Sequence, residues 1–137
     1  MRREKKRRSR TSLEAIDHAS FLQMLTDEFP EVPPAFDEYG KGLLHCEMGV
    51  FARLTEEAMD AGRFWQVEQY FRFIERVRES ATPEVENAVD VSYLESLALS
   101  EVTDNRCRAI KRMPQALRAI LLELDGRGRW GENRRLP

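Results

Sequence analysis

The predicted fold is decided by the stretch Pro83-Glu-Val-Glu-Asn-Ala-Val-Asp-Val-Ser-Tyr-Leu-Glu-Ser-Leu-Ala-Leu99. Thr82 before it is a good N-cap, and Pro83 suits the first helical position, where its missing N–H leaves no hydrogen bond unmade. At about 100° per residue, two sides of this helix are apolar. They carry Val91, Leu94 and Ala98 on one side, and Val85, Val89 and Leu99 on the other. Because a helix that is apolar on two sides needs neighbours on both, we expect helix 83–99 to lie at the centre of an all-α bundle.

Length and composition favour one helical domain. The chain has 137 residues, of which 42% are hydrophobic and 34% charged, which suits one core but not two ordinary domains. Cys46 and Cys107 are interpreted as packed thiols in a reduced compartment rather than as a disulfide framework. No apolar run approaches the roughly 18 residues of a membrane span, and no signal-peptide pattern follows the N-terminus. We therefore expect a soluble, cytoplasmic protein.

The net charge of −2 conceals an acidic body between two basic ends. Residues 1–10 carry seven Lys or Arg and one Glu, residues 127–137 carry four Arg and one Glu, and the remainder carries 22 acids against 11 bases. A like-charge block without apolar residues is disordered in isolation. The sequence therefore predicts a disordered basic arm over 1–11, a helical bundle domain over 12–126 and a flexible basic tail over 127–137.

Helical spacing and stop residues predict the other helices around 83–99. They run from Ser12 or Asp17 to Phe29, from Phe36 or Lys41 to Ala61, from Arg63 to Glu79, over 105–112, and from Pro114 to a stop at Gly126. Prolines and glycines separate them, which is typical of short connections between antiparallel helices. The predicted architecture is a single all-α bundle of about five helices, arranged as antiparallel hairpins around the central helix.

Three polar residues fall on or beside predicted apolar faces. Glu47 lies inside the apolar face of the second helix, so its carboxylate must be paired, hydrogen-bonded or raised in pKa. Asn87 points with the Val91 side of the central helix, and Glu95 lies at the margin of that face. We interpret all three as structural buried polar groups, with Glu47 anchored to a neighbouring helix and an Asn87–Glu47 pair as one possibility. The enzymatic alternative is an acid/base site centred on the same three residues.

The chain contains no motif for a cofactor, a metal or nucleophilic catalysis. It has no Gly-rich phosphate loop, no Ser/His/Asp order, and no Cys/His group at metal-ligand spacing. We therefore predict no metal, no cofactor and no enzymatic activity.

Two features indicate a partner surface. Trp65 lies on the polar half of the third helix, where an exposed Trp either covers a neighbouring element or anchors an interface. Between Arg78 and Arg106 the chain carries acids and no bases, and Tyr93 points among them. Acidic surfaces steer association with cationic partners. The predicted partner-binding residues are Trp65, Glu84, Glu86, Asp90 and Tyr93.

Several segments resemble a family of small, largely uncharacterised bacterial helical proteins. The resemblance rests on Phe29-Pro30-Glu31, the helix after Gly62, the run from Glu86 to Glu95, and Met113-Pro114, and it covers about residues 18–125. Some members of that family serve as immunity proteins of polymorphic-toxin (Rhs or type VI secretion) systems. The resemblance implies neutralisation of a toxin by binding rather than by catalysis, and the basic N-terminus departs from the family pattern.

Charge and resemblance together give the functional hypothesis. We expect a toxin-neutralising immunity protein that binds a basic toxin domain through an acidic helical surface and blocks its active site. The alternative is a nucleic-acid-associated regulator or adaptor that uses the basic arm over residues 1–10, because clustered Lys and Arg release counterions from phosphates. The acidic body opposes close approach to phosphates, so only the basic ends would contribute to such binding.

Overall fold

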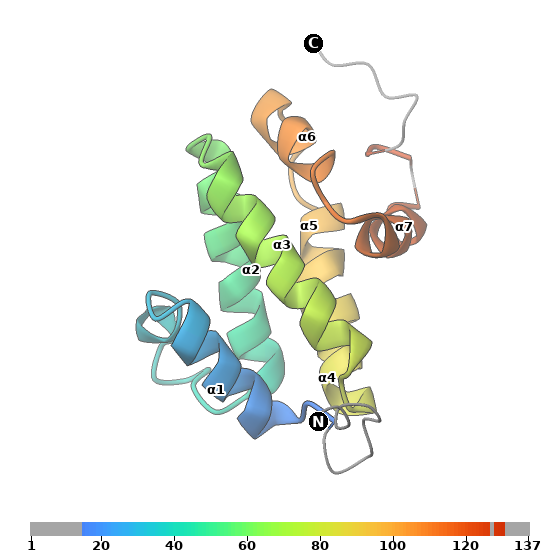
Figure 1. Cartoon of the computed structure of the whole chain (residues 1–137). Coiled ribbons are helices and arrows are strands. Elements are labelled where there is room, and N and C mark those ends of the chain that lie inside the picture. The colour runs from blue at the N-terminus through green and yellow to red at the C-terminus, as the bar shows by residue number, and fades with distance from the viewer. Residues whose placement is uncertain (1–14, 127, 131–137) are drawn as a thin grey trace, which may run out of the picture.

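The computed structural model describes residues 15–126 and 128–130, and this part of the chain forms an all-α bundle without strands (Figure 1). The helices are α1 (His18–Glu28), α2 (Leu44–Asp60), α3 (Phe64–Glu79), α6 (Asp104–Ile110) and α7 (Gln115–Leu124), together with a continuous central helix made of α4 (Pro83–Ala88), η4 (Val89–Leu94) and α5 (Glu95–Ala98). A short 3₁₀ turn, η3 (Pro33–Ala35), lies between α1 and α2. The predicted fold class is confirmed. The predicted basic arm over 1–11 lies outside the described residues.

Side-chain caps fix the starts of two helices where the sequence indicated them. Asp17 caps α1 by accepting a 2.9 Å hydrogen bond from the Ser20 N–H, and this bond lowers the pKa of the Asp17 carboxyl. The first helix therefore begins at the second of its two predicted starts. Thr82 caps α4 in the same way, accepting from the Val85 N–H at 3.3 Å.

A tight turn joins α2 and α3 into the predicted hairpin. Gly62 has φ of 76°, a left-handed conformation that glycine adopts without steric cost. The Arg63 N–H donates to the Ala58 carbonyl at 2.9 Å, which is the closing bond of a Schellman motif. The third helix then ends at Glu79, as predicted.

The central helix is enclosed on several sides. Its segments contact α1, α2, α3 and α7, and Figure 1 shows it passing behind α3. The aromatic core lies beside it: the Phe51 ring centroid of α2 is 5.0 Å from that of Tyr70 and 5.3 Å from that of Tyr93. The prediction that 83–99 packs among other helices is confirmed.

The central helix contains a π-helical segment, η4, that the sequence did not indicate. A π turn accommodates one extra residue, so the faces before and after it are offset by about one position. The buried residues are Val85, Ala88, Val89, Tyr93, Leu94, Leu97 and Ala98. Val91 and Leu99 are exposed instead of packed, which corrects the predicted apolar faces. Both predictions assumed an uninterrupted spacing of 3.6 residues per turn.

A backbone bridge ties the start of the described chain to the α3–α4 joint. The Ile16 N–H donates to the Ser80 carbonyl at 2.8 Å, and the Thr82 N–H donates to the Ile16 carbonyl at 2.9 Å. Ile16 is itself buried in the core. The entry to α1 is thereby fixed beside the start of the central helix.

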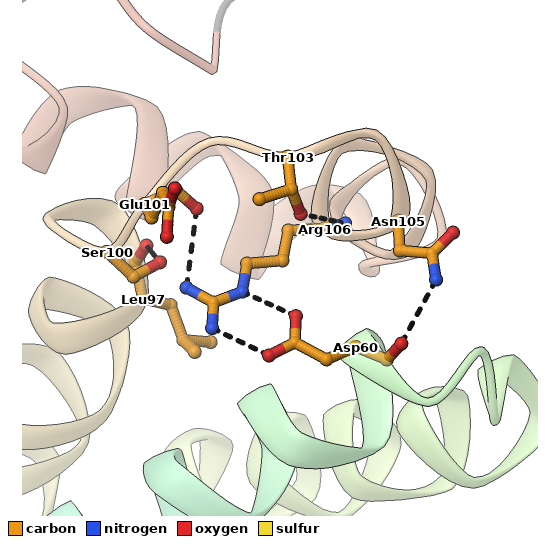
Figure 2. A network of polar contacts seen from close by, with 7 residues as sticks. All are labelled: Asp60, Leu97, Ser100, Glu101, Thr103, Asn105 and Arg106. Carbon is orange, nitrogen blue, oxygen red and sulfur yellow. Dashed lines mark hydrogen bonds and ion pairs between the residues drawn. The ribbon is translucent and has the colours of Figure 1, made fainter.

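Helix α6 is fastened to the end of α2 by a polar network (Figure 2). The Arg106 guanidinium donates two hydrogen bonds of 2.8 Å to the Asp60 carboxylate, and Asn105 donates to the Asp60 carbonyl at 3.2 Å. The hydrogen bond from Arg106 lowers the pKa of Asp60, and the same bond raises the pKa of Arg106. Arg106 also donates to the Glu101 carbonyl at 3.3 Å, so one side chain joins α2, α6 and the loop before α6.

The described end of the chain packs against the bundle. Trp130 is only 4% exposed; its indole N–H donates to the Ala98 carbonyl at 2.8 Å, and its backbone N–H donates to Asp125 at 2.6 Å. The predicted flexible tail over 127–137 is therefore wrong for residues 128–130, and the domain extends past its predicted end at 126. Burial of a tryptophan side chain is favourable when its indole N–H has a hydrogen-bond acceptor, because the apolar ring leaves water and no donor is left unpaired. Residues 131–137 lie outside the described range.

Candidate partner-binding surface

The predicted partner residues do not converge on one surface. Trp65 is 75% exposed near the start of α3, whereas Glu84, Glu86 and Asp90 follow the far end of that helix. At about 1.5 Å per residue, the 14 or so residues between these points separate them by roughly 20 Å. The structure therefore brings Glu86 and Asp90 together at Arg78, with Glu84 on another side of the helix and Trp65 apart from all three.

Two of the three acids are neutralised within the molecule. The Arg78 guanidinium donates to both oxygens of Asp90 at 2.8 and 3.0 Å, and its Nη2 lies 3.0 Å from Glu86. The hydrogen bond to Asp90 raises the pKa of Arg78. Glu84 is exposed and has no ion-pair partner among residues 15–126 and 128–130. The predicted acidic cluster is thus mainly an internal ion pair between α3 and the central helix.

Tyr93 belongs to the core and not to the surface. Its side chain is fully buried, its hydroxyl is 2.8 Å from the Thr55 hydroxyl, and burial raises the pKa of its phenol. The prediction of a partner contact at Tyr93 is wrong, because the π segment turns this residue inward where an α-helix would place Ser92.

Of the three predicted buried polar residues, only Glu47 is buried. Glu47 is 2% exposed, and its two oxygens accept from different groups: His18 Nε2 lies 2.7 Å from Oε1, and the Gly42 N–H donates to Oε2 at 2.7 Å. This arrangement joins α1, the α1–α2 connection and the first turn of α2. Asn87 is exposed, because the offset at η4 leaves it outside with Val91, and Glu95 is only partly buried. The Asn87–Glu47 pair does not form.

A pocket that the sequence did not indicate lies next to Glu47. It measures about 220 Å³ between the α1–α2 connection and the start of α2. Its lining is Phe36, Asp37, Tyr39, Gly40, Cys46, Glu47 and Val50. Tyr39 at its rim is 91% exposed, and Leu43 nearby is also exposed. The sequence signal for this pocket was two large apolar residues, Tyr39 and Leu43, in a connection otherwise rich in Gly and charged residues. The signal was weak, because neither helical nor strand spacing predicts burial in such a connection.

Acidic side chains outnumber basic ones in the part of the chain before α3, which includes this pocket. Within residues 15–62 the only bases are Lys41 and Arg53, against Asp17, Asp27, Glu28, Glu31, Asp37, Glu38, Glu47, Glu56, Glu57 and Asp60. Arg76 pairs with Glu28, and Arg53 pairs with Glu57 at 2.8 Å. Asp37 lines the pocket and Glu38 follows it in the chain; both are exposed, and neither has an ion-pair partner in the described part of the chain. Asp37 and Glu38 of the α1–α2 connection therefore keep their negative charge unpaired within the described part of the chain.

Over 15–126 and 128–130, no group of three or more His, Cys, Asp or Glu side chains is arranged to hold a metal ion. Within the same ranges, none of the helices has the length and hydropathy needed to cross a bilayer.

The fold and surface define a small all-α bundle with an acidic, aromatic-rimmed hollow at one end. The chain belongs to the family described as a domain of unknown function, DUF7674, which matches residues 22–130. The match ends at the buried Trp130 and so includes the segment that packs behind α5. Neither a curated protein nor a solved structure matches the chain.

Proposed function

We propose that this chain is a binding module that neutralises a basic toxin domain in the cytoplasm by covering its active site, without catalytic activity of its own. The observation that carries the proposal is the pair of exposed acids, Asp37 and Glu38, in the α1–α2 connection, neither of which has an ion-pair partner in the described part of the chain. A surface of one sign raises the encounter rate with a partner of the opposite sign. The resemblance to immunity proteins supplies the class of partner.

The polar groups inside the bundle support a binding role over a catalytic one. Both Glu47 oxygens are engaged by His18 and Gly42, and the Tyr93 hydroxyl is engaged by Thr55. A general acid or base needs an atom within hydrogen-bond reach of a substrate. These groups are bonded to the protein itself and stabilise its architecture.

The test is co-expression with the product of the adjacent gene, followed by purification and titration calorimetry. We expect a 1:1 complex, rescue of growth when that product is toxic, and weaker binding at high salt. The salt effect follows because the Debye length falls from about 10 Å at 0.1 M to about 3 Å at 1 M.

The control is a separate acidic helical protein of similar net charge, which should neither rescue growth nor form a defined complex. If no neighbouring toxin is found and co-expression rescues nothing, the proposal is wrong. If rescue occurs through turnover of a small molecule by this chain, the non-catalytic part is wrong.

A further inference from the structure

We propose that the pocket lined by Phe36, Tyr39, Cys46 and Val50 receives one apolar side chain of the cationic partner, with the partner's flanking Lys or Arg residues beside Asp37 and Glu38. This proposal rests on the proposed function and locates its docking site at the α1–α2 connection. It replaces the site predicted around Glu84, Glu86 and Asp90, two of whose acids are held by Arg78.

The size and lining of the pocket favour a side chain over a small ligand. Its volume of about 220 Å³ is below the roughly 300–1,000 Å³ that is usual for small-molecule sites. Two larger hollows, of about 300 and 440 Å³, have more polar linings and lie along α7 and beside Arg129. Of these three, the smaller pocket is the one with an exposed aromatic side chain, Tyr39, in its lining, and aromatic residues are enriched in the anchor sites of protein interfaces.

The buried carboxylate next to the pocket does not require a polar guest. Glu47 already accepts from His18 and from the Gly42 N–H, so an apolar side chain entering the pocket leaves no acceptor newly unpaired. A free buried carboxylate would instead have demanded a cation or a donor.

The loop over the pocket is held in one conformation. The Asp37 carboxylate accepts from the Gly40 N–H at 2.7 Å, and the Leu43 N–H donates to the Gly40 carbonyl at 2.9 Å. A Cβ on Gly40 would lie 2.9 Å from the Cys46 Cβ, so only glycine lets the loop approach α2 this closely. A preformed site loses little conformational entropy on binding, which favours affinity.

Charge decides the chemistry of the guest. Asp37 lines the pocket, the adjacent Glu38 is also exposed, and Lys41 is the single base in the connection. An acidic partner would meet like charge at close range, whereas a basic one gains attraction on approach and contact at the rim. The guest is therefore a hydrophobic residue between basic residues.

The test is an NMR titration of the full chain with the blocked peptide Lys-Arg-Leu-Arg-Lys, and with the same peptide carrying Ser in place of Leu. We expect saturable shift changes confined to residues 36–50, with the Ser peptide binding about tenfold more weakly. Tyr39→Ser should weaken the Leu peptide by about tenfold, as truncation of an anchor residue does. Cys46 lines the pocket and is exposed, so its alkylation with N-ethylmaleimide should block the site. Cys107 is buried and should react slowly, which keeps the modification selective for Cys46.

Matched variants separate local charge from net charge. Glu38→Gln should weaken the Leu peptide severalfold, while Glu84→Gln, an equal charge change on α4, should leave it unchanged. Equal effects of the two variants, or shift changes centred on residues 84–90, would overturn the proposal. So would shift changes over 36–50 on deletion of residues 1–14, or on dilution of the free chain, because the occupant would then be the chain's own arm or a second copy.

The two proposals fail separately. If the toxin complex forms and Tyr39→Ser and Glu38→Gln leave its affinity unchanged, the docking site is wrong and the proposed function stands. If the peptide binds at residues 36–50 and no toxin complex forms, the pocket stands and the proposed function is wrong.

Discussion

Glu47 illustrates what a single residue reveals from sequence and what it conceals. Its place in an apolar helical face predicted burial and anchoring, and both are found. Its partners were not predictable, because helical spacing indicates which way a side chain points but not what lies opposite. His18 is 29 positions away, and Gly42 contributes a backbone N–H rather than a side chain.

Replacing Glu47 with Gln should lower the free energy of unfolding by about 1–3 kcal/mol. An amide has one oxygen, so it cannot accept from His18 and from Gly42 with separate oxygens as the carboxylate does. Urea denaturation at neutral pH measures the change. The control, Glu38→Gln at an exposed position, should change the stability by no more than about 0.5 kcal/mol. An unaltered unfolding midpoint for Glu47→Gln would show that the carboxylate is not an anchor.

The Asp60–Arg106 pair should make the protein acid-sensitive. The pKa of Asp60 is lowered from 3.8, mainly by the hydrogen bond from Arg106, so the folded state favours the carboxylate. The stabilisation is complete above pH 3.8 and is lost as the pH falls through the lower folded-state value. It amounts to about 1 kcal/mol or less, because Asp60 is half exposed.

Stability curves of the wild type and Asp60→Asn between pH 7 and pH 2 test this dependence. The two curves should converge below pH 4, because the difference between the proteins disappears once Asp60 is protonated. Parallel curves over the whole range would mean that the pair contributes nothing.

At the scale of elements, helices with strong end signals were predicted well, and the departure from helical regularity was not. The bounds of α3 and the start of α4 follow from Gly62 and Thr82, whose signals are local. The π segment is set by packing on both sides of the central helix, and no residue type encodes it. Predictions for Tyr93, Asn87 and Leu99 failed together for this one reason.

Removing one residue from η4 should restore an ordinary helix. If Val91 is deleted, the seven buried positions of the central helix follow the spacing i, i+3, i+4, i+7, i+8, i+11 and i+12, which is one face of an α-helix. We expect the Val91 deletion to remain folded, with cooperative thermal unfolding followed by circular dichroism.

The matched control is deletion of Glu75 from α3, which has no π turn to absorb the change and must rotate Val77 away from the core. The Glu75 deletion should lose more stability than the Val91 deletion. A Val91 deletion that is equally destabilised or unfolded would refute the interpretation of η4 as a one-residue offset.

Across the whole molecule, charge is distributed unevenly along α2: acids prevail at its first end, while acids and bases are mixed at its last. The acidic α1–α2 connection precedes the helix, while α6, with Arg106 and Arg108, adjoins its last residue (Figure 1). A helix of 17 residues separates these ends by about 25 Å. The sequence predicted an acidic body but not this distribution, because the bases of α6 are distant in the chain and are brought beside the acids at the end of α2 by folding. The exposed acids of the α1–α2 connection favour approach of a cationic partner from that end.

The two tryptophans should differ in how much each side chain contributes to the stability of the whole bundle. Trp130→Ala should cost about 3–5 kcal/mol, because it empties a buried aromatic site behind α5. Trp65→Ala, at an exposed site, should change stability by about 0.5 kcal/mol or less. Chemical denaturation measures both, and equal losses would contradict the packed position of Trp130.

The bridge at Ile16 has a mechanical consequence. Its two hydrogen bonds to Ser80 and Thr82 close the first three helices into a ring that a pull on the amino end cannot unravel one turn at a time. The load passes instead into the joint before the central helix, and both bonds must break before α1 is stretched. Force spectroscopy of a chain tethered at residue 1 should therefore record a distinct early rupture. Ile16→Pro should lower the rupture force, because it removes the N–H donor of one of the two bonds and keeps the carbonyl acceptor of the other.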